Sequence, residues 1–133
     1  MDYTVSNAGG IFSLRGRAVP ARVMNQIAET DVTFTRRGRD WVGRCLICGG
    51  PLRFDAVTGE GATVEHILPR SLGGTSELRN LGITHASCNH EKGKRWDGGR
   101  FRRAAPERYN GLVERLQRER ERRWREPGDT EAR

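Results

Sequence analysis

The residues of this 133-residue chain best suited to bind a metal ion are three cysteines and three histidines, and four of them form two short pairs. Cys45 and Cys48 are separated by two residues and followed by Gly49-Gly50, a pattern typical of a tight turn that points two thiolates at one ion. His85 and Cys88 repeat the spacing and complete a Cys3His set suited to tetrahedral zinc. Four protein ligands leave no open coordination position, so the pattern predicts a structural zinc site. The alternative is a set of buried free cysteines with a surface histidine.

A second group of chemically capable residues lies in the long segment between the two pairs. Glu65 and His66 are neighbours within residues 63–68, where β-branched and apolar residues predict a strand that turns at Gly73-Gly74. Residues 81–84 are the expected return strand, and residues 89–95 the expected short helix beside it. Neighbours on a strand point to opposite faces, so Glu65 and His66 can bind one ion together only if the strand bends. A histidine with a pKa near 6.5 can accept a proton from water, and a carboxylate binds hard cations.

The order of these motifs resembles the HNH endonuclease family, which has a ββα-metal fold. The resemblance covers residues 45 to about 95, under half of the chain. It rests on the CxxC knuckle, the strand and turn Glu-His-Ile-x-Pro-x-Ser-x-Gly-Gly, an Asn-Leu pair, and HxxCN followed by Lys92 and Gly93. The segment is most similar to small phage and bacterial nucleases whose third zinc ligand is histidine.

By position, the resemblance implies that His66 is the general base and that Glu65 and Asn89 hold one catalytic divalent cation. It also implies that Asn80 braces the loop that orients His66. The implied cation is Mg²⁺ or Mn²⁺, with Ni²⁺ and Zn²⁺ as further candidates. In the family the first acidic position is more often Asp and the last position often His; Glu65 and Asn89 both keep an oxygen ligand, so we expect activity. His90 is a rival ligand, with a solvent-facing or phosphate-contacting role as the favoured alternative.

The charge balance favours a polyanionic partner. The chain has 24 Lys and Arg against 17 Asp and Glu, a net charge of +7, and a pI near 10.3. Nucleic acid is the expected partner, with an anionic membrane as the rival. Arg70, Lys92, Lys94 and Arg95 flank the proposed site and are the basic residues that we expect on DNA phosphates.

Composition also argues against secretory and membrane classes. The first residues carry Asp2 where a signal peptide has positive charge, and no stretch is apolar enough to span a membrane. An odd number of cysteines favours metal ligation in a reducing cytoplasm over disulfides. We therefore expect a cytoplasmic protein with no membrane partner.

The sequence divides into three parts: an N-terminal arm and short helix (1–40), a nuclease core (41–98) and a C-terminal basic, mixed-charge helix and tail (99–133). Residues 1–18 are assigned no structure. Pro20 opens a short helix that ends near Thr30, with apolar residues on one face. That face consists of Val23, Met24 and Ile27.

A second helix is predicted beyond residues 98–99, with a recurring face formed by Tyr109, Leu112, Val113, Leu116, Arg120 and Trp124. Glu and Arg recur at i,i+4 spacing along its end, as Glu114-Arg118, Glu119-Arg123 and Glu121-Arg125. Mixed charge favours a solvated helix, and the alternative is a helix whose arginines follow a nucleic-acid backbone.

These observations predict an α+β protein with a zinc-supported ββα-metal core and flanking helices, acting as a metal-dependent DNA endonuclease. The alternative is a non-catalytic zinc-ribbon module that binds nucleic acid, which has no need of Glu65, His66 and Asn89. RNA or branched DNA is a further candidate substrate. A homodimer and a phage packaging (terminase) partner both stay open, as do roles in packaging, restriction and homing.

Overall fold

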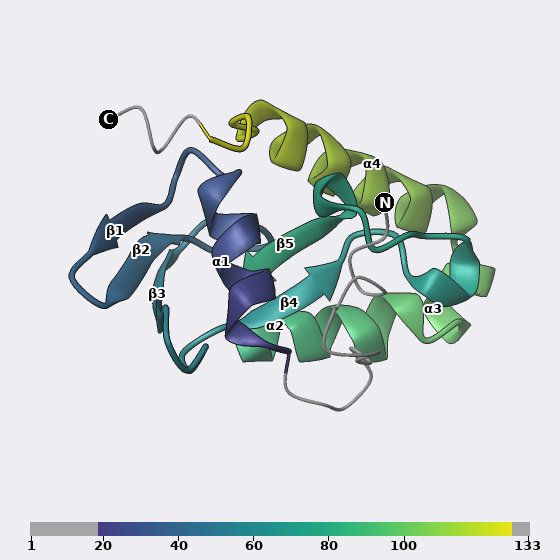
Figure 1. The fold of residues 1–133 in the computed structure, drawn as a ribbon. Coiled ribbons are helices and arrows are strands. Elements are labelled where there is room, and N and C mark those ends of the chain that lie inside the picture. Colours follow the sequence, from purple (N-terminus) through teal and green to yellow (C-terminus); the bar gives the residue numbers. More distant parts are fainter. Residues whose placement is uncertain (1–18, 129–133) are drawn as a thin grey trace.

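Two small antiparallel sheets organise residues 19–128, the part of the chain that the computed structural model describes (Figure 1). The expected arm at 1–18 lies outside the described residues. The elements in chain order are α1 (Ala21–Glu29), β1 (Thr35–Arg37), β2 (Asp40–Arg44), β3 (Pro51–Asp55), β4 (Thr63–His66), η1 (Arg70–Leu72), η2 (Leu78–Asn80), β5 (Leu81–Thr84), α2 (Ala86–Glu91), the π-helical turn η3 (Lys92–Asp97), α3 (Arg100–Ala104) and α4 (Pro106–Arg122). No helix in the described range is both long and apolar enough to cross a membrane.

The first sheet, β1-β2-β3, is not among the elements that the sequence analysis predicts. Its strands are antiparallel, and Gly38, with φ of 60°, lies in the tight turn between β1 and β2. Trp41 and Phe54 are paired across β2 and β3 and are both buried on the inner face. Alternate residues point outward, so one face packs on the core and the other stays open to solvent.

The second sheet, β4-β5, and the helix α2 after it form the expected ββα arrangement. β5 has the predicted bounds, whereas β4 ends at His66, two residues before the predicted end. The helix starts at Ala86, earlier than expected, and continues into η3. The mixed fold is α+β, as predicted, and Figure 1 shows α2 along one side of β4 and β5 with α4 along the other.

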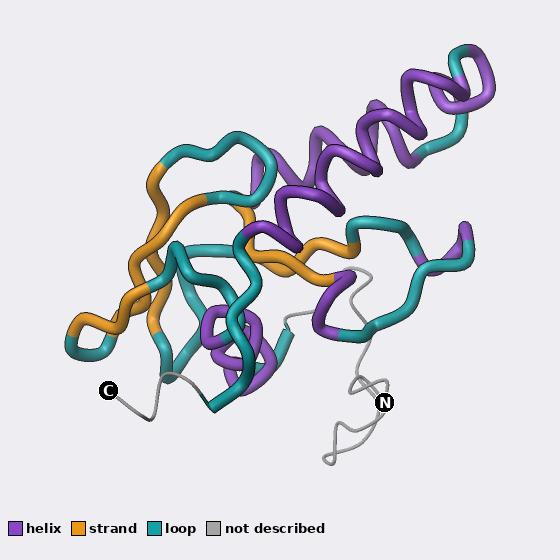
Figure 2. Tube along the Cα trace, turned by 90° about the horizontal axis from the view of Figure 1, so that it is seen from above, coloured by secondary structure: helices purple, strands orange, loops and turns teal. Residues whose placement is uncertain are grey.

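The two flanking helices cover this core. α1 buries the predicted residues Val23, Met24 and Ile27, and α4 buries Tyr109, Val113, Leu116 and Arg120. Pro106 occupies the first turn of α4, where its missing N–H costs nothing. Figures 1 and 2 both place the three-stranded sheet at one end of the molecule and α3 at the other.

The end of α4 differs from both sequence-based alternatives, because three arginines at and just beyond its end are buried. We call Arg120, Arg123 and Arg125 the arginine clamp; they are 1%, 3% and 7% exposed. Arg120 donates to the backbone oxygens of Thr30, Leu81 and Leu78 over 2.8–3.1 Å.

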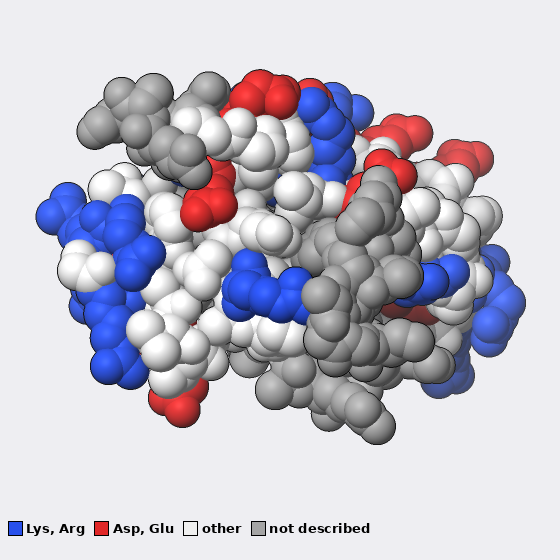
Figure 3. All heavy atoms as spheres, in the orientation of Figure 1, with Lys and Arg blue, Asp and Glu red and all other residues white. Residues whose placement is uncertain are grey.

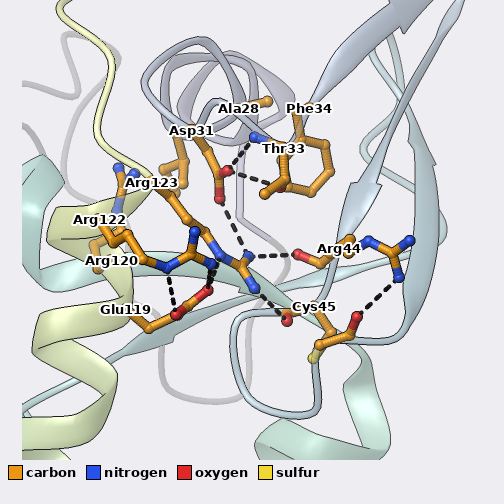
Figure 4. A network of polar contacts seen from close by, with 12 residues as sticks. Ala28, Asp31, Thr33, Phe34, Arg44, Cys45, Glu119, Arg120, Arg122 and Arg123 are labelled. Atoms are coloured by element: carbon orange, nitrogen blue, oxygen red, sulfur yellow. Dashed lines mark hydrogen bonds and ion pairs between the residues drawn. The ribbon is translucent and has the colours of Figure 1, made fainter.

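The other two clamp residues extend the same network. Arg123 donates to the backbone oxygens of Arg44 and Cys45 and to the Glu119 carboxylate (Figure 4). Arg125 donates to four carbonyls, those of Ala28, Glu29, Asp31 and Phe34.

Of the three predicted Glu-Arg pairs, Glu119-Arg123 forms, at 2.6 Å. Glu121 pairs with Arg79 instead, because Arg125 has turned inward to the carbonyls. The interpretation of the terminal arginines as solvated, or as following a nucleic acid, is therefore wrong for Arg123 and Arg125, whereas Arg120 is buried on the predicted recurring face. Charge spacing alone gives no sign of carbonyl acceptors contributed by distant segments.

Candidate active site

The four predicted zinc ligands meet at the junction of the two sheets. Cys45 and Cys48 lie in the turn between β2 and β3, and His85 and Cys88 begin α2. One ligand atom from each lies within 4.8 Å of all the others, so the group could hold a tetrahedral ion such as zinc. Gly49 has a φ of 76°, which allows the chain to turn back beneath the sulfurs.

Hydrogen bonds around this group favour metal ligation. The backbone N–H groups of Cys48 and His85 donate to Cys45 Sγ, and that of Gly50 donates to Cys48 Sγ. His85 Nε2 lies 2.9 Å from the Pro51 carbonyl, while Nδ1 lies 3.4 Å from Cys48 Sγ. A carbonyl only accepts, so Nε2 carries the proton and Nδ1 presents its lone pair to the sulfurs, as a ligating histidine requires.

The cysteine pKa values also show that this group suits a cation. The Gly50 N–H lowers the pKa of Cys48 to about 7, while burial, together with the neighbouring sulfurs, raises the pKa of Cys88 to about 12. Thiolates this close together cannot all ionise without positive charge between them. A dication supplies that charge, so the donor set fits Zn²⁺.

The buried carboxylate of Glu65 lies in a cluster of three charged residues. Glu65, Lys92 and Asp97, which we call the charge cluster, join β4 to η3: Lys92 Nζ lies 2.5 Å from Glu65 Oε2 and 2.8 Å from Asp97 Oδ2. Lys92 is 2% exposed and also donates to the His66 carbonyl at 3.3 Å. Glu65 Oε2 is buried and, among the described residues, accepts no hydrogen bond of regular geometry. This oxygen therefore faces a positive charge and has room in its coordination for another donor or a cation.

Burial dominates the electrostatics of Glu65. Loss of solvent raises the pKa of its carboxyl to about 7, although Lys92 acts in the opposite direction. The nearby Asp97 carboxylate adds to the rise. Near neutral pH the side chain is thus close to its midpoint, and any further positive charge would favour the carboxylate.

Tyr109 of α4 supports the charge cluster from outside the HNH-like segment. Its hydroxyl donates to Asp97 Oδ1 at 2.7 Å, and burial together with Asp97 raises its pKa, so the hydroxyl stays a donor. The role of Asp97 does not follow from the sequence pattern, which places Tyr109 only in a packing face. The tyrosine within that face is the available signal, because a buried hydroxyl requires a partner.

His66 lies at the end of β4 and is held by a serine that the sequence analysis did not single out. Ser76 Oγ lies 2.9 Å from His66 Nε2 and is fully buried. Arg70 Nη1 donates to the same hydroxyl at 3.1 Å, so the predicted phosphate contact Arg70 lies beside the histidine. The ring of His66 is therefore fixed through a loop residue ten positions away.

Asn80 closes the loop that carries Ser76. Its Oδ1 accepts from the Leu68 N–H, and its Nδ2 donates to the carbonyls of Leu68 and Thr75. Gly74 allows the same loop to fold tightly, since a Cβ there would lie 1.7 Å from the Leu68 oxygen. Asn80 thus touches the loop on both sides of the turn.

Asn89 lies on α2 against the start of β4. Its Nδ2 donates to the Val64 carbonyl and to Thr63 Oγ1, which leaves Oδ1 as the atom able to bind a cation. His90, the rival ligand, is exposed on the next helical position.

The predicted phosphate contacts differ in their exposure to solvent. Lys94 and Arg95 are exposed on η3, where Arg95 pairs with Glu91 at 3.4 Å. Lys92 is buried in the charge cluster, and so in this structure it is not a surface contact for DNA. The carboxylates of Glu65 and Asp97 compensate the charge of Lys92 in the interior. The basic run Lys92 to Arg95 gives no sign of these partners.

Comparison with known families supports the resemblance noted in the sequence. Residues 45–95 match the family model described as HNH endonuclease, which supports a nuclease-type function. No curated protein and no solved structure gave a significant match. The matched segment contains both halves of the Cys3His group, the β4-β5 hairpin and α2. The family match is thus confined to this central segment, residues 45–95, which is under half of the chain.

Proposed function

We propose that the chain is a metal-dependent DNA endonuclease that hydrolyses a phosphodiester bond, with His66 as general base and one divalent cation at Glu65 and Asn89. The observation that carries the proposal is the placement of a buried carboxylate beside an anchored histidine at the end of β4. The family match supplies the reaction class. In this proposal residues 41–98 are the nuclease core, and the segments at 1–40 and 99–133 are its extensions.

The donor atoms fit a hard cation. Glu65 Oε2 is a buried oxygen that already faces the Lys92 ammonium, and the hydrogen bonds of Asn89 Nδ2 leave its amide oxygen for ligation. A divalent cation at these oxygens supplies stabilisation of the charge that develops on the phosphate. Glu65 must then share its carboxylate with Lys92 or release it.

His66 would take the proton from the attacking water. If Nε2–H donates to Ser76 Oγ, the basic lone pair is on Nδ1, and Ser76 can accept from His66 and Arg70 together. Asn80 keeps Ser76 in place through the loop, so its role in this proposal is positioning. Arg70, beside the same serine, is placed to bind a phosphate oxygen.

The proposal is tested by nicking of supercoiled plasmid in Mg²⁺ or Mn²⁺ by the zinc-loaded protein. We expect the wild type to cut and His66→Ala to lose about 10²- to 10⁴-fold in rate, which is the usual contribution of a general base. His90→Ala is the matched control, since it removes an exposed histidine of α2 and should cut at the wild-type rate.

Equal rates for His66→Ala and the wild type would remove His66 from catalysis. If the wild type binds DNA but fails to cut it with any of the divalent cations tested, the non-catalytic zinc-ribbon binding module becomes the better account.

A further inference from the structure

The three-stranded sheet carries five exposed arginines, on its outer face, at its β1 edge and in the β1-β2 turn. We call this surface the arginine face; its residues are Arg36, Arg37, Arg39, Arg44 and Arg53. They come from β1, the β1-β2 turn, β2 and β3, and Figure 3 shows basic side chains gathered over β1 and β2. Arg44 directly precedes the zinc knuckle, the other four lie several residues before or after it, and none belongs to the proposed catalytic site.

The carboxylates on this surface do not balance the arginines. Asp55 pairs with Arg39 at 2.7 Å, and Asp40 pairs with Arg53 at 3.4 Å. Within residues 19–128, no carboxylate pairs with Arg36, Arg37 or Arg44. Arg36 lies over the Trp41 ring at 5.7 Å and donates to the Gly38 carbonyl, which holds its side chain along the sheet.

The arginine clamp provides a comparison, because its arginines have a structural role in the interior. Clamp guanidinium groups are buried and donate to carbonyls, whereas those of the arginine face are exposed with positive charge left over. The exposed side of α4 instead mixes acidic and basic residues (Figure 3). Unbalanced guanidinium groups on an open sheet face fit a polyanion, because guanidinium binds phosphate through two parallel hydrogen bonds.

The arginine face is coupled to the candidate active site through the zinc knuckle. β2 and β3 end in the turn that carries Cys45 and Cys48, while α2 begins at the other two ligands. Leu46 N–H also donates to the Ile83 carbonyl of β5 at 3.0 Å. A bound zinc ion would therefore fix the orientation of the open sheet relative to β4 and α2.

We propose that the arginine face binds the phosphate backbone of the DNA duplex, as a docking surface separate from the proposed catalytic residues. The choice of DNA rests on the proposed function. β1 is an edge strand whose residues are all exposed, and it supplies Arg37 from the outer face and Arg36 from the other side of the edge.

The test measures DNA binding against salt in a His66→Ala background, with a fluorescent duplex and no added divalent cation. Arg36→Gln/Arg37→Gln should lower the slope of log K against log[salt] by about 2, because each phosphate contact contributes about 1. Arg108→Gln/Arg118→Gln removes the same charge from the exposed side of α4 and should leave the slope near that of the parent. Arg36→Lys/Arg37→Lys should restore most of the slope, since the charge returns.

Equal slopes for the two glutamine pairs would overturn the proposal, as would an absence of DNA binding by the parent. Loss of binding to anionic vesicles with unchanged DNA binding would assign the face to a membrane and overturn it as well. If the wild type fails to cut DNA while the slopes differ as expected, catalysis is wrong and the arginine face stands.

Discussion

Two groups of buried cations lie in this small domain, and they face different kinds of partner. The arginine clamp at the end of α4 donates mostly to backbone carbonyls, and each of its residues reaches segments far away in the sequence. Lys92 faces the two carboxylates of the charge cluster, one of which has a pKa raised to about 7.

This difference separates a structural use of buried charge from a functional one. Guanidinium groups bonded mostly to neutral carbonyls stay charged at physiological pH. They connect the end of α4 to the end of α1, to β2 and to η2. A lysine between carboxylates forms an ion-pair network that can exchange partners, and such networks cost stability unless every group is satisfied.

Removal of zinc should have the largest effect, because the knuckle touches both regions. Arg123 of the clamp donates to the Cys45 carbonyl, and α2, which begins at the ligands, leads to Lys92. Structural zinc sites contribute about 10 kcal/mol or more to folding. We expect a strong chelator to unfold the protein cooperatively, seen as loss of the near-ultraviolet circular dichroism signal of the tryptophans.

Re-addition of zinc should restore that signal. A native spectrum and unchanged unfolding midpoint after complete zinc removal would show that the Cys3His group is not a structural metal site.

Loss of one clamp residue should come next. Arg120→Met removes the buried side-chain donor to the carbonyls of Thr30, Leu81 and Leu78, so we expect the free energy of unfolding to fall by about 3 to 5 kcal/mol. Arg118→Met, an exposed control on the same helix, should change it by less than about 0.5 kcal/mol. Both quantities come from urea denaturation.

The folded fraction of Arg120→Met should cleave DNA at a rate within about twofold of the wild type, since the clamp does not touch the site. A loss of cleavage by the folded variant would contradict the claim that the clamp is structural and the charge cluster functional.

The dependence of stability on pH should distinguish the charge cluster from the clamp. The folded-state pKa of Glu65 is about 7, above its unfolded value near 4.5, so the folded protein holds a proton that the unfolded chain releases. This contribution is fully present below about pH 4.5 and is lost as pH rises through 7. We expect a difference of about 1 to 3 kcal/mol between pH 5 and pH 8 in magnesium-free protein, measured against Glu65→Gln.

Glu65→Gln should lack this component, because an amide does not titrate. Identical pH profiles for the two proteins would mean that burial does not raise the pKa of Glu65.

The smallest effect is expected at the contact between α4 and the charge cluster. Tyr109→Phe removes the hydroxyl that donates to Asp97 but keeps the buried ring, and should lower the free energy of unfolding by about 1 kcal/mol. Urea denaturation measures the loss. Combining it with Asp97→Asn should give a less than additive effect, because both changes break one hydrogen bond; strict additivity would contradict the contact.

The sequence predicted the elements whose pattern is local. α1, β5 and α4 follow from apolar spacing, with Pro20 before α1, and the Cys3His set follows from ligand spacing. The sheet β1-β2-β3 was missed because β1 is short and wholly exposed, with no alternation to detect.

Roles that depend on long-range contacts were not readable. The acceptors of Arg120 come from residues 30, 78 and 81, and the burial of Lys92 depends on Glu65, 27 positions before it. Nothing in the sequence distinguishes Ser76 from other loop residues, because its contact with His66 depends on the fold of the loop. Periodicity reports which face of an element is buried, but not which partner receives a buried charge.

One variant tests most directly whether the charge cluster serves function. It replaces all three charges by neutral residues of similar size, Glu65→Gln/Lys92→Met/Asp97→Asn. Its free energy of unfolding and its plasmid cleavage would be measured on the same zinc-loaded preparation. We predict stability within about 1 kcal/mol of the wild type or above it, because neutral packing often replaces buried ion pairs without loss, together with loss of cleavage. A variant that loses several kcal/mol yet still cuts DNA would show that the cluster is structural, as the arginine clamp is.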